Sequence, residues 1–359
     1  MPDISISQLT TKNSLSAANY LPISDALETF KLGTNSLFGY RNRLINGGFS
    51  INQRATSTGA TNTYTLDRWI CANQSANTTI TQQTDQANGI PFNIRVGNGA
   101  TAQKFGVIQY VESANCRDLR GKQVTLSFSV RFNGGTPTIR YGIIEWTGTA
   151  DTITTPIISN YGTTPPTIAT GGTLNSTIFN PTAADTWYNL TLTYTAGSSM
   201  NNLAVVIMTN SSSSFNSNRN LDIANVQLEE GSTATPFEFR PISTELSLCQ
   251  RYYYKTYNLN VVPGTATFVG AAMGVVNSGG YPLMSGLTLK TTMRSSPNVV
   301  FYNPNDGQTA LPICDDASPV NNTSTYLTTA GQDRIIMYTN SGLSPGNGCY
   351  THFTASAEL

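Results

Sequence analysis

The sequence contains little charge and almost no histidine. Its 359 residues include 20 Lys and Arg and 20 Asp and Glu, so the formal net charge is zero and charged residues make up only 11% of the chain. Binding to nucleic acid through counterion release needs a basic surface, so this composition excludes that class of partner. His352 is the one histidine, and metal sites that need two histidines from one chain are therefore excluded as well.

Other absences restrict the chemistry further. No apolar run approaches the roughly 18 residues of a membrane span, and the first residues lack the basic start and apolar stretch of a signal peptide. We therefore expect synthesis in a cytoplasm and no membrane insertion. No glycine-rich phosphate loop occurs, so we expect no cofactor. The cysteines are widely spaced and form no CxxC motif, which favours buried thiols over a disulfide framework; they are Cys71, Cys116, Cys249, Cys314 and Cys349.

Hydroxyl and amide side chains take the place of charge. Ser, Thr and Asn supply about a third of the chain, far above ordinary usage, while 39% hydrophobic residues are enough to build a core. Residues 124–132 alternate strictly between apolar and polar, which predicts a half-buried strand. Residues 187–194 alternate likewise, and 203–208 form an apolar run of strand length. Short strands between polar turns predict an all-β protein built of antiparallel sandwiches.

Two boundaries divide the chain. Pro236 and Pro241 precede a segment with helical spacing, 243–253, in which Ser243 is the candidate N-cap. A second boundary lies near Arg43, because the residues before it are too few and too polar to hold a core alone. We therefore expect an N-terminal arm (1–42), a larger β domain (43–242) and a distal β domain (243–359). In the distal domain the expected strands are 265–276, 283–289, 298–302, 334–338 and 349–355.

An ordered set of short motifs resembles bacteriophage tail fibres and receptor-binding proteins. Arg43-Leu-Ile-Asn-Gly-Gly-Phe49 and Leu66-Asp-Arg-Trp69 look like the opening of their jelly-roll domain, and Asn225-Val-Gln-Leu-Glu-Glu-Gly231 looks like its closing strand. Further motifs resemble the linker to the distal domain, the distal domain itself and the virion-anchoring start; they are Glu245-Leu-Ser-Leu-Cys-Gln-Arg-Tyr-Tyr-Tyr254, Met293-Arg-Ser-Ser-Pro297, Phe353-Thr-Ala-Ser-Ala-Glu-Leu359 and Ile6-Ser-Gln-Leu9.

The resemblance implies a structural virion protein that is not an enzyme. It implies a homotrimer whose N-terminal arm attaches to tail or baseplate proteins and whose β domains, a jelly roll and a distal β-sandwich, bind polysaccharide on the bacterial surface. Two alternatives remain open: a decoration or connector protein without receptor binding, and a polysaccharide depolymerase. A structural Ca²⁺ also remains open, although no DxDxDG loop is present.

Catalytic residues are not expected. The letters GxSxG occur at 342–346, but Pro345 follows the serine and has no N–H for an oxyanion hole. His352 is expected to be a sheet residue with one hydrogen bond. A depolymerase needs two convergent carboxylates, whereas adjacent acidic residues on a strand point to opposite faces; the candidates are Asp315-Asp316, Glu229-Glu230, Glu145 and Asp306.

Aromatic residues near loops are the candidates for sugar contact, because a ring packs against the apolar face of a pyranose. Trp146 ends a predicted strand just before a polar loop, and we expect it to be partly exposed. The ligand-binding candidates in the distal domain are Tyr302, Asp306 in the turn beside it, and Tyr326. Packing at a strand end or a trimer interface is the alternative for each. Trp69 and Trp187 lie within strand patterns and are expected in the core.

Overall fold

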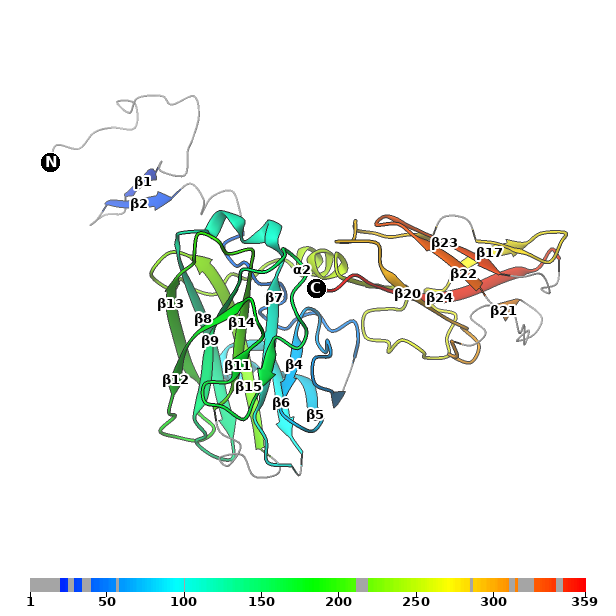
Figure 1. Ribbon diagram of the computed structural model, residues 1–359. Coiled ribbons are helices and arrows are strands. Elements are labelled where there is room, and N and C mark those ends of the chain that lie inside the picture. Colours follow the sequence, from blue (N-terminus) through cyan, green and yellow to red (C-terminus); the bar gives the residue numbers. More distant parts are fainter. Residues whose placement is uncertain are drawn as a thin grey trace.

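The computed structural model describes residues 40–55, 58–99, 101–210, 219–284, 287–309, 326–339 and 345–359, with the backbone alone for 20–24, 29–33, 283, 314–315, 326–328 and 338–339. Figure 1 shows two β units, which we call the sandwich (43–241) and the distal unit (251–359), with α2 (Ile242–Gln250) at their junction. The all-β prediction is confirmed. Among the described residues, no helix is long and apolar enough to cross a membrane.

The sandwich consists of two antiparallel sheets. The five-stranded sheet has the order β12 (Gly172–Phe179), β9 (Ile139–Trp146), β14 (Asn202–Thr209), β7 (Phe105–Val111) and β4 (Ile70–Asn73). The six-stranded sheet has the order β13 (Tyr188–Thr195), β8 (Gln123–Asn133), β15 (Arg219–Glu230), β6 (Ile90–Asn98), β5 (Thr78–Asp85) and β3 (Thr58–Gly59).

The core lies between these sheets, where alternation along each strand places it. On β8, Val124, Phe128 and Phe132 face inward and are buried, as the sequence predicts. On the opposite face of the same strand, Thr125 bonds the Thr193 hydroxyl of β13 across 3.0 Å. Hydroxyl pairs of this kind satisfy a sheet surface without charge, which accounts for the composition.

A second apolar layer covers the outer face of the five-stranded sheet. Residues 147–171, with the short strands β10 (Ile158–Asn160) and β11 (Thr167–Ile168), fold back over that face. Lys104 holds this cover in place, because its Nζ donates to the carbonyl oxygens of Tyr161 and Thr163 at 2.7 and 2.8 Å. The sheet face that a long ligand could otherwise reach is thus filled by the chain itself.

The distal unit also contains two sheets. One has the order β16 (Tyr253–Lys255), β24 (Gly348–Ser356), β17 (Ala272–Val276) and β18 (Pro282–Leu283), with β20 (Asn298–Tyr302) and β21 (Cys314–Asp315) also paired to β24. The other has the order β19 (Leu287–Thr288), β23 (Arg334–Thr339) and β22 (Tyr326–Ala330).

Two predicted strands of the distal unit are shorter than the sequence indicates. The strand expected over 265–276 begins only at Ala272, because Gly264 and Gly270 adopt φ of +89° and +87° and place turns before it. The segment expected as one strand over 283–289 divides into the ends of β18 and β19.

Little of the expected N-terminal arm falls within the described residues. β1 (Tyr20–Ser24) and β2 (Thr29–Gly33) pair as an antiparallel hairpin. The motif at 6–9 lies outside the described part. Arg41 and Asn42 donate their backbone N–H groups to the Glu238 carboxylate at 3.0 and 3.1 Å, which ties the start of the sandwich to its exit.

The helix at the junction begins one residue before the predicted segment. Pro241, not Ser243, is the N-cap, and the fixed φ of proline suits a chain that turns directly into a helix. Cys249 and Tyr252 pack with Ile45 and Ile51 of the sandwich. Cys71, Cys116, Cys249 and Cys349 are buried thiols, as expected, while the side chain of Cys314 lies outside the described residues.

Ion pairs join the distal unit to the sandwich. Glu358 pairs with Arg54 at 2.6 Å and also with Arg68, whose side chain is only 1% exposed. The two guanidinium groups stack on Tyr253 and Tyr252, with the carbon atoms 3.8 and 3.6 Å from the ring centroids. The last described residues therefore return to the junction beside α2 (Figure 1).

Replacing Glu358 by Gln should weaken this junction strongly. The change leaves Arg68 buried without its carboxylate, and an unpaired buried charge costs about 3–5 kcal/mol. We expect a loss of that size in the free energy of unfolding, measured by urea denaturation. Glu230→Gln is the matched control, because its pair with Lys122 is exposed and such pairs contribute at most about 1 kcal/mol. Equal losses in the two variants would contradict the assigned role of Glu358.

Candidate functional site

Trp146, the sugar-contact candidate in the sandwich, is buried. It is 4% exposed and belongs to the apolar layer beneath residues 147–171. Its indole N–H donates to the Thr149 carbonyl at 3.0 Å. Gly148 and Gly171 lie so close that a Cβ at either position would be 2.5 or 3.2 Å from the ring. The expectation of partial exposure was wrong, because the loop after β9 folds onto the ring and does not extend away from it.

The candidates of the distal unit are not brought together with Trp146. Tyr302 ends β20 and is half-buried, and its ring packs edge-on against Tyr257 at a centroid distance of 5.9 Å. Asp306 is exposed in the following turn and accepts the Gln308 backbone N–H at 2.9 Å. Tyr326 begins β22, and its side chain lies outside the described residues. The ligand-binding role of these three residues stays a prediction.

His352 is a structural residue of β24. It is fully buried and stacks on Tyr257 at 3.7 Å between centroids. It makes two hydrogen bonds, one more than expected: Nε2 to the Thr267 carbonyl at 2.9 Å and Nδ1 to the Thr256 hydroxyl at 2.8 Å. A carbonyl accepts only, so Nε2 carries the proton. Burial lowers the pKa of His352 below its ordinary value, although the hydrogen bond to the Thr267 carbonyl acts in the opposite direction.

Three of the candidate carboxylates have structural partners, whereas the side chains of Asp315 and Asp316 lie outside the described residues. Glu229 is buried and accepts the Thr235 hydroxyl at 2.7 Å, whereas its neighbour Glu230 pairs with Lys122 at the surface. Glu145 accepts the Tyr194 hydroxyl at 2.7 Å. Among the described residues, no group of three or more His, Cys, Asp or Glu side chains could hold a metal ion. With these partners, no two of Glu145, Glu229 and Glu230 face the same solvent-exposed site.

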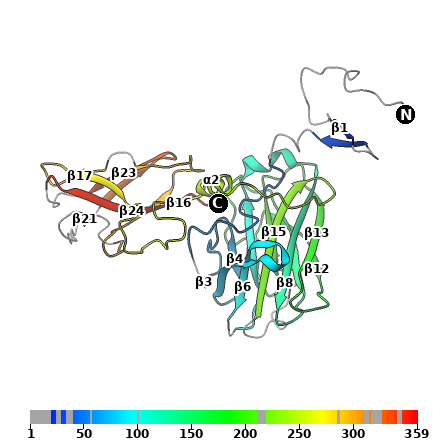
Figure 2. The same cartoon turned by 180° about the vertical axis from the view of Figure 1, so that it is seen from behind.

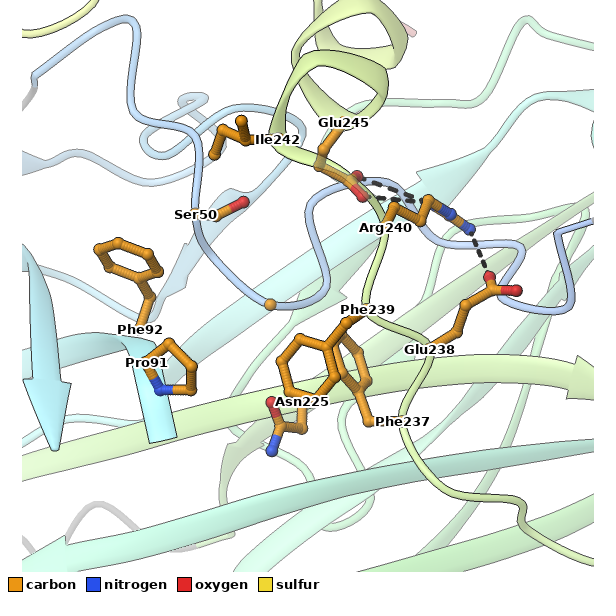
Figure 3. Close-up of a pocket in the computed structure, with 11 residues that line it drawn as sticks. Ser50, Pro91, Phe92, Asn225, Phe237, Glu238, Phe239, Arg240, Ile242 and Glu245 are labelled. Atoms are coloured by element: carbon orange, nitrogen blue, oxygen red, sulfur yellow. Dashed lines mark hydrogen bonds and ion pairs between the residues drawn. The ribbon is translucent and has the colours of Figure 1, made fainter. Parts of the chain in front are cut away.

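A pocket of about 200 Å³ opens at the end of the six-stranded sheet, beside the start of α2. Figure 3 shows Phe92 on one side of this space and Phe237 and Phe239 on another, with Ser50 and Asn225 also directed toward it. Phe239 is 65% exposed, and its ring meets Phe237 edge-on at 4.9 Å. Pockets for drug-sized ligands start near 300 Å³, so this one suits a single sugar-sized ring.

Local backbone features create the pocket. Asn225 adopts φ of +52° where the register of β15 shifts against β8, and a bulge of this kind re-aims a side chain. Gly48 leaves room for Phe237, because a Cβ there would lie 3.3 Å from the phenyl ring. The linker that carries both phenylalanines follows directly from β15. The pocket thus combines segments that are about 190 residues apart in sequence.

An ion-pair cluster fixes one wall. The Arg240 side chain is 3% exposed and pairs with Glu238 at 3.3 Å and with Glu245 at 3.4 Å. It also donates to the backbone carbonyls of Asn42 and Leu44. Because these groups already hold one another, the wall is rigid before any ligand arrives.

Two polar side chains in the pocket are free to bind. Within the described part of the chain, neither the Ser50 hydroxyl nor the Asn225 amide has a hydrogen-bond partner. Three phenyl rings beside a free hydroxyl and a free amide provide apolar contact and directed hydrogen bonds, which are the requirements for non-covalent recognition of a small polar ring. None of the residues predicted to bind sugar lines this pocket, although the alternation Phe237-Glu-Phe239 between two prolines is a local signal for it.

Trp187 lies on the outer face of the same sheet, not in the core as expected. Its indole N–H donates to Asp85 at 2.9 Å, and the same carboxylate oxygen accepts from Arg131 at 2.6 Å. Arg131 and Arg95 both bind Asp222, which is fully buried. These bonds hold the β5–β6 turn over the outer face of the six-stranded sheet. Figure 2 shows the turn in front of β15. The hydrogen bond from Trp187 is the main cause of the lowered pKa of Asp85.

Comparisons with protein families and with curated protein sequences gave no match. Three solved structures show remote similarity. The enzymatically active domain of bacteriophage CBA120 tailspike protein 4 is 13% identical with a TM-score of 0.35, over 54% of this chain and 22% of that chain. TmCBM61 in complex with beta-1,4-galactotriose is 12% identical with a TM-score of 0.33, over 54% and 100%. The CBM22-1–GH10 modules of Clostridium thermocellum xylanase 10B, complexed with xylohexaose, are 15% identical with a TM-score of 0.34, over 56% and 30%. Similarities this remote carry no argument about function.

Acid should destabilise the protein through His352. In the unfolded chain the imidazole has its ordinary pKa of about 6.5, whereas burial lowers the pKa in the folded chain. Below pH 6.5 the unfolded state therefore binds the proton first, and stability falls. We expect the free energy of unfolding to drop more between pH 7.5 and pH 5.5 in the wild type than in His352→Asn. The same pH dependence in both proteins would refute the assignment.

Proposed function

We propose that the protein is a trimeric bacteriophage tail fibre that recognises a glycan on the bacterial surface. Residues 1–42 would attach it to tail or baseplate proteins in the virion, and the sandwich would bind the glycan. The observation that carries the proposal is the pocket between Phe92, Phe237 and Phe239. Beside the rings lie the Ser50 hydroxyl and the Asn225 amide, which have no hydrogen-bond partner among the described residues.

The chemistry of the pocket fits a saccharide unit. A pyranose has an apolar face that packs on aromatic rings and a rim of hydroxyls that exchange hydrogen bonds with hydroxyl and amide groups. Phe239 is largely exposed and accessible from solvent. Arg240 pairs with both Glu238 and Glu245, so the wall of the pocket carries two carboxylates to one guanidinium and does not favour an anionic ligand. A neutral sugar is therefore the favoured ligand class.

A single pocket of this size binds weakly, and multivalency would supply the affinity. Three copies on one fibre turn the second and third binding events into intramolecular ones, which raises avidity by about 10²–10⁴ without new contacts. This arrangement suits a repetitive polysaccharide on a cell surface. It also explains how host recognition can work without a strongly charged or deep site.

Non-covalent binding is favoured over cleavage. Hydrolysis of a glycosidic bond needs a carboxylic acid and a carboxylate that are free to act. Glu238 accepts two backbone N–H groups, and Glu245 accepts the Asn46 backbone N–H, while both pair with Arg240. Both carboxylates of the pocket are thus engaged in holding the fold. We expect no release of sugar fragments from a bound polysaccharide.

Two variants of the pocket test the proposal. Phe239→Ala removes an exposed ring, and Asn225→Gly removes the amide while retaining a residue that tolerates positive φ. Each should weaken binding to a positive glycan on an array of bacterial surface polysaccharides by about tenfold, since each contact contributes about 1–1.5 kcal/mol. Ile178→Ala, an exposed change on β12, is the control and should bind as the wild type does.

The same assay separates the alternatives. A wild-type protein that binds no polysaccharide and no cell of a host panel would favour a connector or decoration role. Unchanged binding by both pocket variants would place the glycan site elsewhere, for example at Tyr302 and Asp306. Shortened polysaccharide after incubation would favour a depolymerase.

A further inference from the structure

Strand β17 is apolar on both faces, although only one face is covered. Ala272 and Val276 point inward and pack against the core of the distal unit. Met273 and Val275 point the other way and are 69% and 52% exposed. A sheet with one solvated face normally alternates apolar and polar residues. The sequence Ala-Met-Gly-Val-Val is instead typical of a strand that is buried on both sides.

The exposed side chains of β17 form part of a continuous apolar surface. Met273 lies directly opposite Tyr350 of β24, and the ring of Phe268 meets Tyr350 edge-on at 5.5 Å. Phe268 itself is 50% exposed. We call Phe268, Met273, Val275 and Tyr350 the β17 face. Figure 1 shows that β17 lies toward the end of the distal unit, away from the sandwich.

The segment that supplies most of this face carries no charge at all. No Asp, Glu, Lys or Arg occurs between Lys255 and Lys290. Val269 and Tyr281 of the same segment are also exposed, at 62% and 47%. Depletion of charge together with exposed aromatic residues and methionine is the composition of the core of a protein–protein interface, and soluble monomers rarely expose such patches.

The strand also has an open edge. Ala272, Met273 and Gly274 pair with β24 on one side. On the other side β18 reaches only Val275 and Val276, so no strand of the described residues continues along 272–274. Proteins usually protect such edges with lysine, proline or a bulge. None of the five residues of β17 is charged or a proline.

We propose that the β17 face is the surface through which copies of this chain associate. A second copy is the occupant that fits its chemistry, because an uncharged surface meets its own counterpart without like-charge repulsion. A saccharide would find no hydrogen-bonding partner in the side chains of Met273 and Val275, and an anionic membrane would find no basic residue in the segment. The inference deepens the proposed trimeric fibre by naming its contact surface.

The test compares oligomeric states of the full chain by sedimentation velocity over a range of concentrations. The wild type should sediment as a multiple of 38.6 kDa, three copies for the proposed fibre. The double change Met273→Lys and Val275→Lys places like charges at the contact and should raise the dissociation constant at least about 100-fold. Ile178→Lys is the matched control, since it adds a lysine at another exposed strand position, and it should leave the mass unchanged.

Two results would overturn the proposal: a wild type that stays a single chain at every concentration, or a double variant that keeps the wild-type mass. Folding of the double variant is checked by its single imidazole NMR signal, because His352 lies on the neighbouring strand. A milder double variant is Met273→Thr with Val275→Thr, because threonine suits a strand. It should weaken association less than the two lysines do.

Glycan binding is scored separately. A dissociated double variant should retain the affinity of the single pocket and lose avidity for whole cells. Oligomers without glycan binding would overturn the proposed function alone, and a glycan-binding single chain would overturn the interface alone.

Discussion

The docking of the two units depends on the Glu358 carboxylate, which pairs with two arginines at the junction. Glu358 neutralises Arg68, which is enclosed between the sandwich and the distal unit, and the Arg68 guanidinium in turn lies 3.6 Å from the centroid of Tyr252. Without that carboxylate the arginine would be a buried charge, and the cost of burying it would oppose the docking of the two units. The hydrophobic contacts of Cys249 and Tyr252 with Ile45 and Ile51 lie at the same junction.

The sequence has few charges, and its buried charged groups are held by ion pairs or by hydrogen bonds, which restricts where a ligand could bind. The sandwich covers its five-stranded sheet with residues 147–171 and crosses its six-stranded sheet with the Asp85 turn. The outer face of the five-stranded sheet is therefore covered by the chain, whereas Asn189 and Thr191 of β13 stay exposed on the outer face of the other sheet. The pocket lies near α2, beside the central strands β15 and β6, where the linker after β15 leaves a gap between rings. Binding in this pocket would depend on its shape and on a few free hydrogen-bonding groups, not on electrostatic attraction to a charged ligand.

The local sequence pattern was sufficient to predict the strands, but not to predict which residues of different segments lie together. Alternation predicted β8 and β13, and residues 298–302 were predicted with their observed bounds. Trp146 and Trp187 were assigned to the wrong environments, because their exposure depends on which loop folds over them, and that is a long-range property. Asn225 and Phe239 could not be recognised as neighbours of Ser50 and Phe92, since only the folded sandwich brings them together. The positive φ of Asn225 also leaves no mark that distinguishes it from the many other asparagines.

The return of the last residues to the junction has a mechanical consequence. The distal unit is connected to the sandwich by the chain that leaves α2 and also by the contacts of Glu358 and Leu359, the latter accepting the Tyr64 hydroxyl at 3.0 Å. A body held at two points resists torque that a single flexible linker would absorb. A sideways force on the distal unit would therefore also act on the sandwich. The two units would rotate together, and the distal unit would not turn freely on a linker.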